Sequence, residues 1–208
     1  MSFEFIEVTR EDHVSTVTLN RPESLNALNA GIMQEIEAAS LAFRDDEETR
    51  VVVFRGAGRH FSAGADLKQP PSEPKNLVMR RRDSGLGARM IRAITEIPQV
   101  TIAGVHGVAL GGAACIATAC DFRIGTEDCS LGYPEVNLGI NLMWQSLPLC
   151  VRLIGPARAK RMIMLGDQEP AAILQDWGML DEVVPVDELA QALDRMARRY
   201  AAQPPVAV

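Results

Sequence analysis

Two glycine-rich segments contain the residue types that could stabilise a negative charge through the main chain. They are His60-Phe61-Ser62-Ala63-Gly64-Ala65-Asp66-Leu67 and Gly107-Val108-Ala109-Leu110-Gly111-Gly112-Ala113-Ala114. Small residues let a ligand approach the backbone. The second segment is predicted to begin a helix, and the first N–H groups of a helix have no hydrogen-bond partner within that helix. The helix dipole also favours negative charge there. The two loops could together hold one developing oxyanion, although close helix–strand packing requires the same small residues.

Other catalytic and metal-binding patterns are not present in the sequence. There is no G-x-S-x-G nucleophile elbow, no G-x-x-x-x-G-K-[ST] phosphate loop and no G-x-G-x-x-G dinucleotide fingerprint. His60 and Ser62 lie two residues apart in a loop, which does not predict a nucleophile with its base. The four cysteines form no C-x-x-C pair and have no matching histidines, so we expect neither a metal site nor a disulfide framework. We therefore expect a reduced, cytoplasmic protein.

The composition is that of an ordinary globular protein without a membrane segment. The 208 residues are 47% hydrophobic and 23% charged, and the net charge of -6 gives no general attraction to nucleic acid or to anionic membranes. The dense basic run Arg80-Arg81-Arg82 is either a solvated helix face or a phosphate contact. No apolar stretch reaches the roughly 18 residues that span a bilayer, and the N-terminus lacks the apolar core of a signal peptide.

Alternating strand and helix patterns must position the two loops. Period-2 alternation predicts a hairpin over 4–8 and 14–19, and apolar runs predict buried strands at 51–54, 100–105 and 121–124. The helical pattern over 29–46 places one apolar face on Ile32, Met33, Ile36, Ala39, Leu41 and Phe43. Further helices are predicted over 80–97, 111–119, 142–153, 156–165, 171–175 and 187–201, and the proline-rich stretch 69–75 is predicted to be a surface loop. This order indicates one α/β domain over 1–208, with a core from about 3 to 185 and a helical tail from about 187.

Several motifs occur in a recognisable order along nearly the whole chain. They are Asn20-Arg21-Pro22, Asn26-Ala27-Leu28, Phe61 to Leu67, Gly107 to Gly112, Cys120-Asp121, Pro134-Glu135 and Trp177 to Val184. In order and spacing they resemble the motifs of the enoyl-CoA hydratase/isomerase (crotonase) family. The resemblance implies a crotonase-like ββα superhelix, a lyase or isomerase of fatty acid metabolism, and a homo-oligomer that is a trimer or a dimer of trimers. It implies no cofactor beyond the coenzyme A thioester that is the substrate.

The resemblance also assigns residues to an oxyanion hole and to a substrate groove. It implies that the thioester carbonyl oxygen lies between the backbone N–H groups of Ala65 and Gly112 while enolate character develops on it. The residues that it implies for substrate binding are Ser24, Leu25, Ala27, Ala63, Asp66, Leu67, Lys68, Gly111, Cys115, Pro134 and Leu138. For Lys68, an ordinary exposed lysine is an equally good interpretation.

The acid–base residues depart from the two-glutamate pattern of the usual family hydratases. Glu135 matches the glutamate that moves the proton, but the position of the water-activating glutamate is held by Cys115. One carboxylate is enough to move a proton between two carbons, as family isomerases do, and hydration is harder but has precedent among relatives that lack the first glutamate. The small apolar neighbours of Cys115 favour an inert thiol over a reactive one.

Two further departures concern the acyl pocket and the end of the chain. Where the family has a glycine-rich turn, this chain has Asn141-Leu142-Met143-Trp144-Gln145-Ser146, which predicts a reshaped pocket in which Asn141 or Gln145 offers a polar partner or only caps a helix. The helices that usually follow Pro204-Pro205 are not in this sequence, so the C-terminal helical part is expected to be shortened.

A non-catalytic acyl-CoA-binding or assembly subunit is the alternative to an enzyme. RNA binding, known for some relatives, is disfavoured by the acidic balance.

Overall fold

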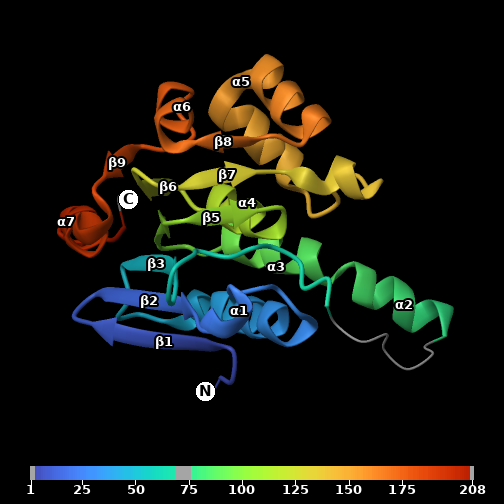
Figure 1. The fold of residues 1–208 in the computed structure, drawn as a ribbon. Helices are drawn as coiled ribbons and strands as arrows, with labels where there is room; N and C mark the ends of the chain where they lie inside the picture. The colour runs from blue at the N-terminus through green and yellow to red at the C-terminus, as the bar shows by residue number, and fades with distance from the viewer. Residues whose placement is uncertain (1–2, 69–75, 207–208) are drawn as a thin grey trace.

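A computed structural model describes residues 3–68 and 76–206 of the chain, so the loop predicted over 69–75 lies outside the described residues. Its larger sheet has the strand order β1-β2-β3-β4-β6-β9 (Figure 1). The strands are β1 (Ile6–Glu11), β2 (Val14–Leu19), β3 (Val51–Gly56), β4 (Val100–Val105), β6 (Phe122–Thr126) and β9 (Glu182–Val184). The β1–β2 pair is the predicted antiparallel hairpin, and the other neighbours are parallel. The α/β class is confirmed.

Helices cover both faces of this sheet, which explains why β3 is apolar at successive positions. Val51 and Val53 face a core that includes Leu193 of α7 (Leu189–Ala201). Val52 and Phe54 point the other way, into the main core formed with α1 (Ala30–Ala42) and α3 (Leu86–Thr95). Successive side chains of a strand point to opposite faces of the sheet. A strand whose two faces are both buried therefore has apolar residues at successive positions.

A second layer of short segments lies between the larger sheet and the outer helices. It contains β5 (Val108–Leu110), β7 (Ser130–Gly132) and β8 (Gln168–Pro170), in the order β5-β7-β8. Two isolated parallel bridges, Ser62 with Ala109 and Leu28 with Ala65, extend this layer toward the N-terminal part of the chain. Each turn of the chain therefore runs from a strand of the large sheet through a short extended segment to a helix, which is the expected ββα superhelix.

The remaining elements are short or lie toward the edge of the molecule. The α-helices are α2 (Leu77–Ser84), α4 (Gly112–Ala119), α5 (Ser146–Leu165, kinked at Gly155) and α6 (Ala171–Asp176). The 3-10 turns are η1 (Pro22–Ser24), η2 (Phe43–Asp45), η3 (Pro134–Leu138) and η4 (Val186–Glu188).

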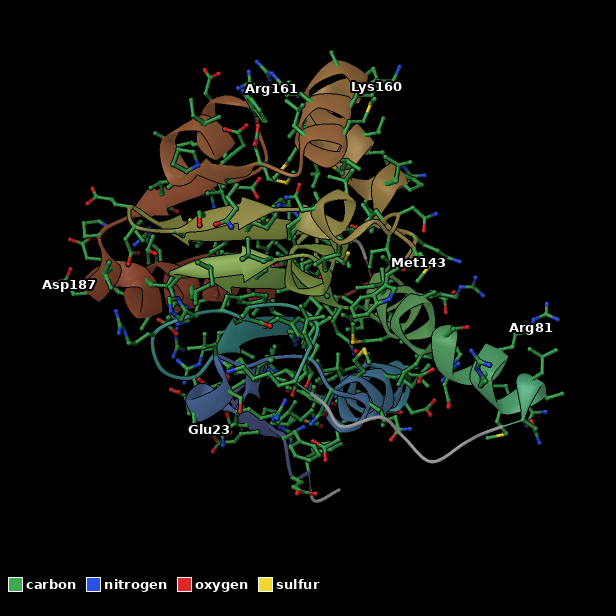
Figure 2. All side chains as sticks on the ribbon, turned by 45° about the vertical axis from the view of Figure 1, so that its right-hand side comes forward. Glu23, Arg81, Met143, Lys160, Arg161 and Asp187 are labelled. Carbon is green, nitrogen blue, oxygen red and sulfur yellow. The ribbon has the colours of Figure 1, made fainter. Side chains whose placement is uncertain are left out.

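In Figure 1, α2 projects from the body of the fold, and Figure 2 shows Arg81 on it pointing outward. All three arginines of the run 80–82 are exposed, which agrees with a solvated helix face.

Several sequence predictions about these elements are wrong in detail. The helix predicted over 80–97 is two helices, α2 and α3, separated at Gly85. The helix predicted from 142 begins at Ser146, because residues 142–145 are not helical and Gln145 has a left-handed backbone with φ of 62°. Leu41 is 40% exposed and does not share the buried face of α1. No helix within 3–68 and 76–206 is long and apolar enough to cross a membrane.

Candidate active site

The two glycine-rich segments are in direct contact at Gly64. This residue has a φ of +85°, and a Cβ placed on it would lie 2.3 Å from the carbonyl oxygen of Leu110 and 3.7 Å from the nitrogen of Gly112. Both values show that the loop before Ala65 lies against the start of α4. No residue with a side chain fits here, because the left-handed backbone and the close approach both require glycine.

The N–H groups of Ala65 and Gly112 are both unpaired. In the bridge between Leu28 and Ala65, the Leu28 N–H donates to the Gly64 carbonyl (2.7 Å) and the Asp66 N–H donates to the Leu28 carbonyl (3.2 Å). The alternation of an extended chain therefore turns the Ala65 N–H away from Leu28. Gly112 is the first residue of α4, whose first N–H groups have no partner in the helix. Within the described residues, neither N–H donates to a protein acceptor.

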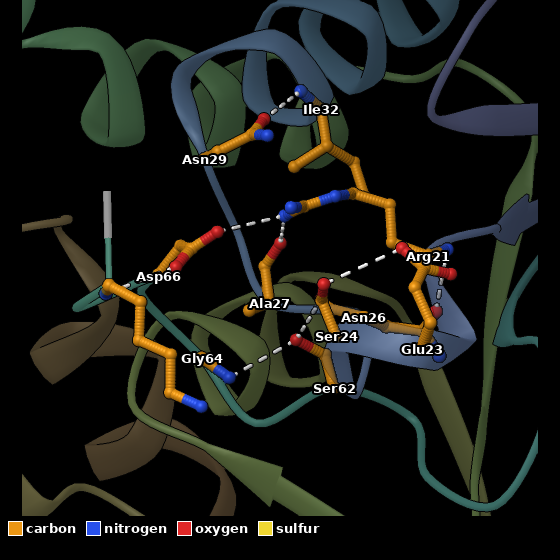
Figure 3. Close-up of polar contacts among 11 residues, drawn as sticks. Arg21, Glu23, Ser24, Asn26, Ala27, Asn29, Ile32, Ser62, Gly64 and Asp66 are labelled. Atoms are coloured by element: carbon orange, nitrogen blue, oxygen red, sulfur yellow. Dashed lines mark hydrogen bonds and ion pairs between the residues drawn. The ribbon is translucent and has the colours of Figure 1, made fainter. Parts of the chain in front are cut away.

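A buried amide and a buried hydroxyl hold the Ala65 loop in place. Asn26 has a φ of +53°, and its side-chain nitrogen donates to the carbonyls of Ala57 and His60 at 2.8 Å and of Phe61 at 3.2 Å. The Ser62 hydroxyl donates to the Asn26 carbonyl (2.7 Å) and accepts the N–H of Gly64 (3.1 Å; Figure 3). Ser62 is fully buried in this Asn26–Ser62 network, so its hydroxyl has a structural role and is not paired with His60 as a nucleophile.

An ion pair joins the segment before α1 to the residue after Ala65. The Arg21 guanidinium donates to the Ala27 carbonyl and to the Asp66 carboxylate, the latter at 3.1 Å, as Figure 3 shows. Both side chains are mostly buried, at 15% and 13% exposure, so this pair contributes more to loop geometry than a surface pair does. The Asp66 carboxylate is therefore paired with the Arg21 guanidinium. The nearby Leu25 and Lys68 are exposed and Ser24 is half-buried.

Glu135 lies beside the start of α4. It stands in η3 directly after Pro134, and one of its carboxylate oxygens, Oε1, is 3.0 Å from where a Cβ of Gly111 would be. Its other oxygen, Oε2, is buried and has no hydrogen-bond partner among the described residues. Burial raises the pKa of Glu135 above its usual value of 4.5, because desolvation penalises the charged form.

A mainly apolar cavity of about 150 Å³ connects these groups. The residues of the expected site that line it are Ala63, Ala65, Leu67, Gly111, Gly112, Pro134, Glu135 and Leu138. The other expected residues (Ser24, Leu25, Ala27, Asp66, Lys68 and Cys115) are not among the residues that line it. Within the described part of the chain, Glu135 is the only titratable side chain in the lining.

The far wall of this cavity includes part of the segment 141–146, which the sequence predicts to reshape the acyl pocket. Of the two polar candidates in that segment, Asn141 lines the cavity and Gln145 is not among the lining residues. The lining of the cavity is completed by Leu110, Ile140, Asn141, Leu142, Met143 and Trp144. The apolar side chains of this wall were not predicted, because the irregular backbone of residues 142–145 does not follow from a helical pattern.

Cys115 lies one turn into α4, within a buried polar cluster. The Thr118 hydroxyl lies 3.0 Å from the Tyr133 hydroxyl and 2.9 Å from the Ser146 hydroxyl. Burial raises the pKa of Cys115 far above its usual range, and burial also raises the pKa of Cys150 to about 11. Both therefore remain thiols at neutral pH, which supports the interpretation of Cys115 as an inert residue. Within the described residues, no three His, Cys, Asp or Glu side chains are grouped so that they could hold a metal ion.

Comparison with known proteins agrees with this combination of a superhelical fold and a mainly apolar cavity. Residues 9–208 match the family model described as enoyl-CoA hydratase/isomerase. The crotonyl-CoA hydratase of Syntrophomonas wolfei is 34% identical over 211 residues, which cover all of this chain and 80% of that protein. The short-chain-enoyl-CoA hydratase of Clostridium acetobutylicum is 32% identical over 209 residues, which cover all of this chain and 79% of that protein.

Solved structures give the same result. The enoyl-CoA hydratase of Bacillus anthracis superposes with a TM-score of 0.92 at 33% identity, covering 99% of this chain and 80% of that one. An enoyl-CoA hydratase/isomerase of Xanthobacter autotrophicus superposes with a TM-score of 0.92 at 35% identity, covering 100% and 77%. The crotonase fold and these relatives define the class as acyl-CoA enzymes. The chain belongs to the enoyl-CoA hydratase/isomerase family.

The Asn26–Ser62 network leads to a prediction about the first loop. Replacing Asn26 by Ala leaves three carbonyls without their donor, so the free energy of unfolding should fall by about 1–3 kcal/mol. Turnover of an enoyl-CoA should fall as well, because the Ala65 N–H is then less well placed. Denaturant unfolding and steady-state kinetics measure the two effects. The control for turnover is Asn76→Ala, which removes the exposed side-chain amide that caps α2. An Asn26→Ala variant that is as stable and as active as the unchanged protein would contradict the role of the network.

Proposed function

We propose that this protein catalyses proton transfer on an enoyl-CoA thioester, with isomerisation of the carbon–carbon double bond as the favoured reaction. The substrate carbonyl oxygen accepts hydrogen bonds from the N–H groups of Ala65 and Gly112. Neither group has an acceptor among the residues that the structure describes, and the N-terminus of α4 adds the positive end of the helix dipole. One fixed donor of this kind is worth about 3–4 kcal/mol of transition-state stabilisation in comparable sites.

The observation that carries this proposal is the position of Glu135. It is the only titratable side chain that lines the cavity within the described residues, and its carboxylate lies beside Gly111, next to the proposed oxyanion donor. Glu135 takes a proton from the carbon next to the thioester carbonyl, and the electron pair of that C–H bond passes to the enolate oxygen. The same carboxylic acid then returns the proton to a carbon two positions further along, so the double bond moves and no atom is gained or lost.

The wider substrate groove is proposed from the residues at the mouth of the cavity. Ala63 and Leu67 line the cavity, and Ser24, Leu25 and Ala27 belong to the segment that the Asn26–Ser62 network and the Arg21–Asp66 pair hold against it. Their backbone groups are proposed to contact the coenzyme A part of the substrate. The exposed Lys68 is proposed to contact the nucleotide end.

Hydration is the second candidate reaction, because several of the similar proteins are named as hydratases. The crotonyl-CoA hydratase and the short-chain-enoyl-CoA hydratase cover the whole of this chain at 34% and 32% identity. In a hydration, Glu135 gives its proton to the carbon next to the carbonyl while water adds to the next carbon. No second carboxylate among the described residues lines the cavity to activate that water, which is why isomerisation is favoured.

Replacing Glu135 by Gln tests the proposal. The amide keeps the shape of the side chain but cannot exchange a proton, so turnover should fall by about 10²–10⁴-fold while acyl-CoA affinity changes little. Kinetics on a panel of 2-enoyl and 3-enoyl thioesters, with calorimetry of butyryl-CoA binding, separates the two effects. In ¹⁸O-labelled water, mass spectrometry distinguishes a shifted double bond from an added oxygen. Unchanged turnover in Glu135→Gln would refute the role of Glu135, and binding without any turnover in the unchanged protein would indicate an acyl-CoA-binding subunit.

The raised pKa of Glu135 also predicts a pH dependence. A base must be ionised to accept the first proton, and burial raises the pKa of this carboxyl above 4.5. Activity should therefore fall as the pH drops through that raised pKa, so the acidic limb of kcat/KM should lie above the usual glutamate range. A kcat/KM profile between about pH 4 and 9 measures it. An acidic limb at or below 4.5 would show that Glu135 is not the titrating base.

A further inference from the structure

Trp144 occupies a slot between two helices and lines the cavity that contains Glu135. A Cβ on Gly87 of α3 would lie 2.1 Å from its indole ring, and a Cβ on Gly112 of α4 would lie 2.1 Å from the same ring. The indole is therefore packed against the backbone of both helices, and only glycine leaves room for it at either position. Trp144 is partly buried against the main core and also lines the cavity.

The chain that follows Trp144 is anchored, so the indole does not sit on a free loop. Gln145 turns the backbone with a φ of 62°, and α5 begins at the next residue, Ser146. The Ser146 side chain is fully buried, and its hydroxyl lies 2.9 Å from the Thr118 hydroxyl of α4. The position of Trp144 is therefore determined on one side by the packing of its ring and on the other by a buried polar contact two residues later.

We propose that Trp144 closes the acyl end of the cavity and restricts this protein to short-chain acyl-CoA thioesters. The inference rests on the proposed function and adds the size of the acyl group to it. The cavity of about 150 Å³ includes the space beside Gly111 and Glu135 where the reacting carbons must lie. A protein cavity of about this volume holds a molecule the size of benzene. An acyl group of about four to six carbons fills such a space, and a longer chain meets the indole.

Binding of saturated acyl-CoA thioesters tests the inference without requiring turnover. Calorimetry compares butyryl-CoA with decanoyl-CoA, and free coenzyme A measures the contribution that the two share. In the unchanged protein the extra methylenes of decanoyl-CoA should add no affinity. In Trp144→Ala, decanoyl-CoA should bind at least about tenfold more tightly than before, because the methylenes then leave water for an apolar space. The affinity for butyryl-CoA should change much less.

Two further variants keep the result clear. Met143→Ala removes an apolar side chain from the same cavity wall, but Met143 is 56% exposed, so this variant should weaken both ligands alike and leave their ratio unchanged. Trp144→Leu, which fills more of the slot than alanine, should give an intermediate ratio and replaces Trp144→Ala if that variant does not fold. A decanoyl-CoA affinity well above that for butyryl-CoA in the unchanged protein, or a ratio that neither Trp144 variant changes, would overturn the inference.

Fluorescence provides an independent measurement. The chain has two tryptophans, so Trp144 is the only one left in Trp177→Phe. Its emission should change when butyryl-CoA binds and not when coenzyme A alone binds, and equal changes with both ligands would overturn the inference. A ratio of decanoyl-CoA to butyryl-CoA affinity that is the same in the unchanged protein and in both Trp144 variants would refute the role of Trp144 alone. Failure to bind any acyl-CoA would refute the proposed function as well.

Discussion

The close approach of Gly64 to the Leu110 carbonyl is the contact on which the rest of the site depends. It joins two loops that follow different strands of the large sheet, and it leaves no space for a side chain between them. Hydrogen bonds hold each loop further. The first loop is held by the Asn26–Ser62 network, and in the second the Gly111 N–H donates to the Gly132 carbonyl at 2.9 Å. The unpaired N–H groups of Ala65 and Gly112 are thereby held before any ligand arrives, which is the condition for effective electrostatic stabilisation of a transition state.

The same close packing determines the chemistry beside it. All eight residues of α4 are buried, and its small side chains let Trp144 and Glu135 approach the helix start. Glu135 is the one titratable group in the cavity wall among the described residues, and burial raises its pKa toward the range in which it can both accept and return a proton. The residue one turn into α4 is the buried thiol of Cys115, where the resemblance to the family hydratases predicts a second carboxylate. The site therefore combines two backbone N–H groups in fixed positions with one acid–base side chain, Glu135, where the usual family hydratases are expected to have two.

The sequence predicts the parts of this structure that depend on local patterns and not those that depend on long-range contacts. The α/β class, the antiparallel hairpin and the buried strand β3 follow from periodicity. Ala65, Gly112 and Glu135 were named through the resemblance to the family, and all three line one cavity. The strands β5, β7, β8 and β9 are only three residues long and were missed, because their pairing partners lie far away in sequence. The slot for Trp144 is formed by glycines of two other helices, which no local pattern reveals. The homo-oligomer and the shortened C-terminal part stay predictions.

The backbone of the two loops is proposed to polarise a thioester carbonyl, and infrared difference spectroscopy measures this polarisation directly. The probe is butyryl-CoA labelled with ¹³C at the carbonyl, bound to Glu135→Gln so that proton exchange cannot interfere. Two fixed donors should lower the carbonyl stretching frequency below that of butyryl-CoA in water. The shift should be lost or reduced in the double variant with Gly64→Ala, because the added methyl group forces the two loops apart. A bound carbonyl frequency equal to that in water, with butyryl-CoA bound, would contradict the account.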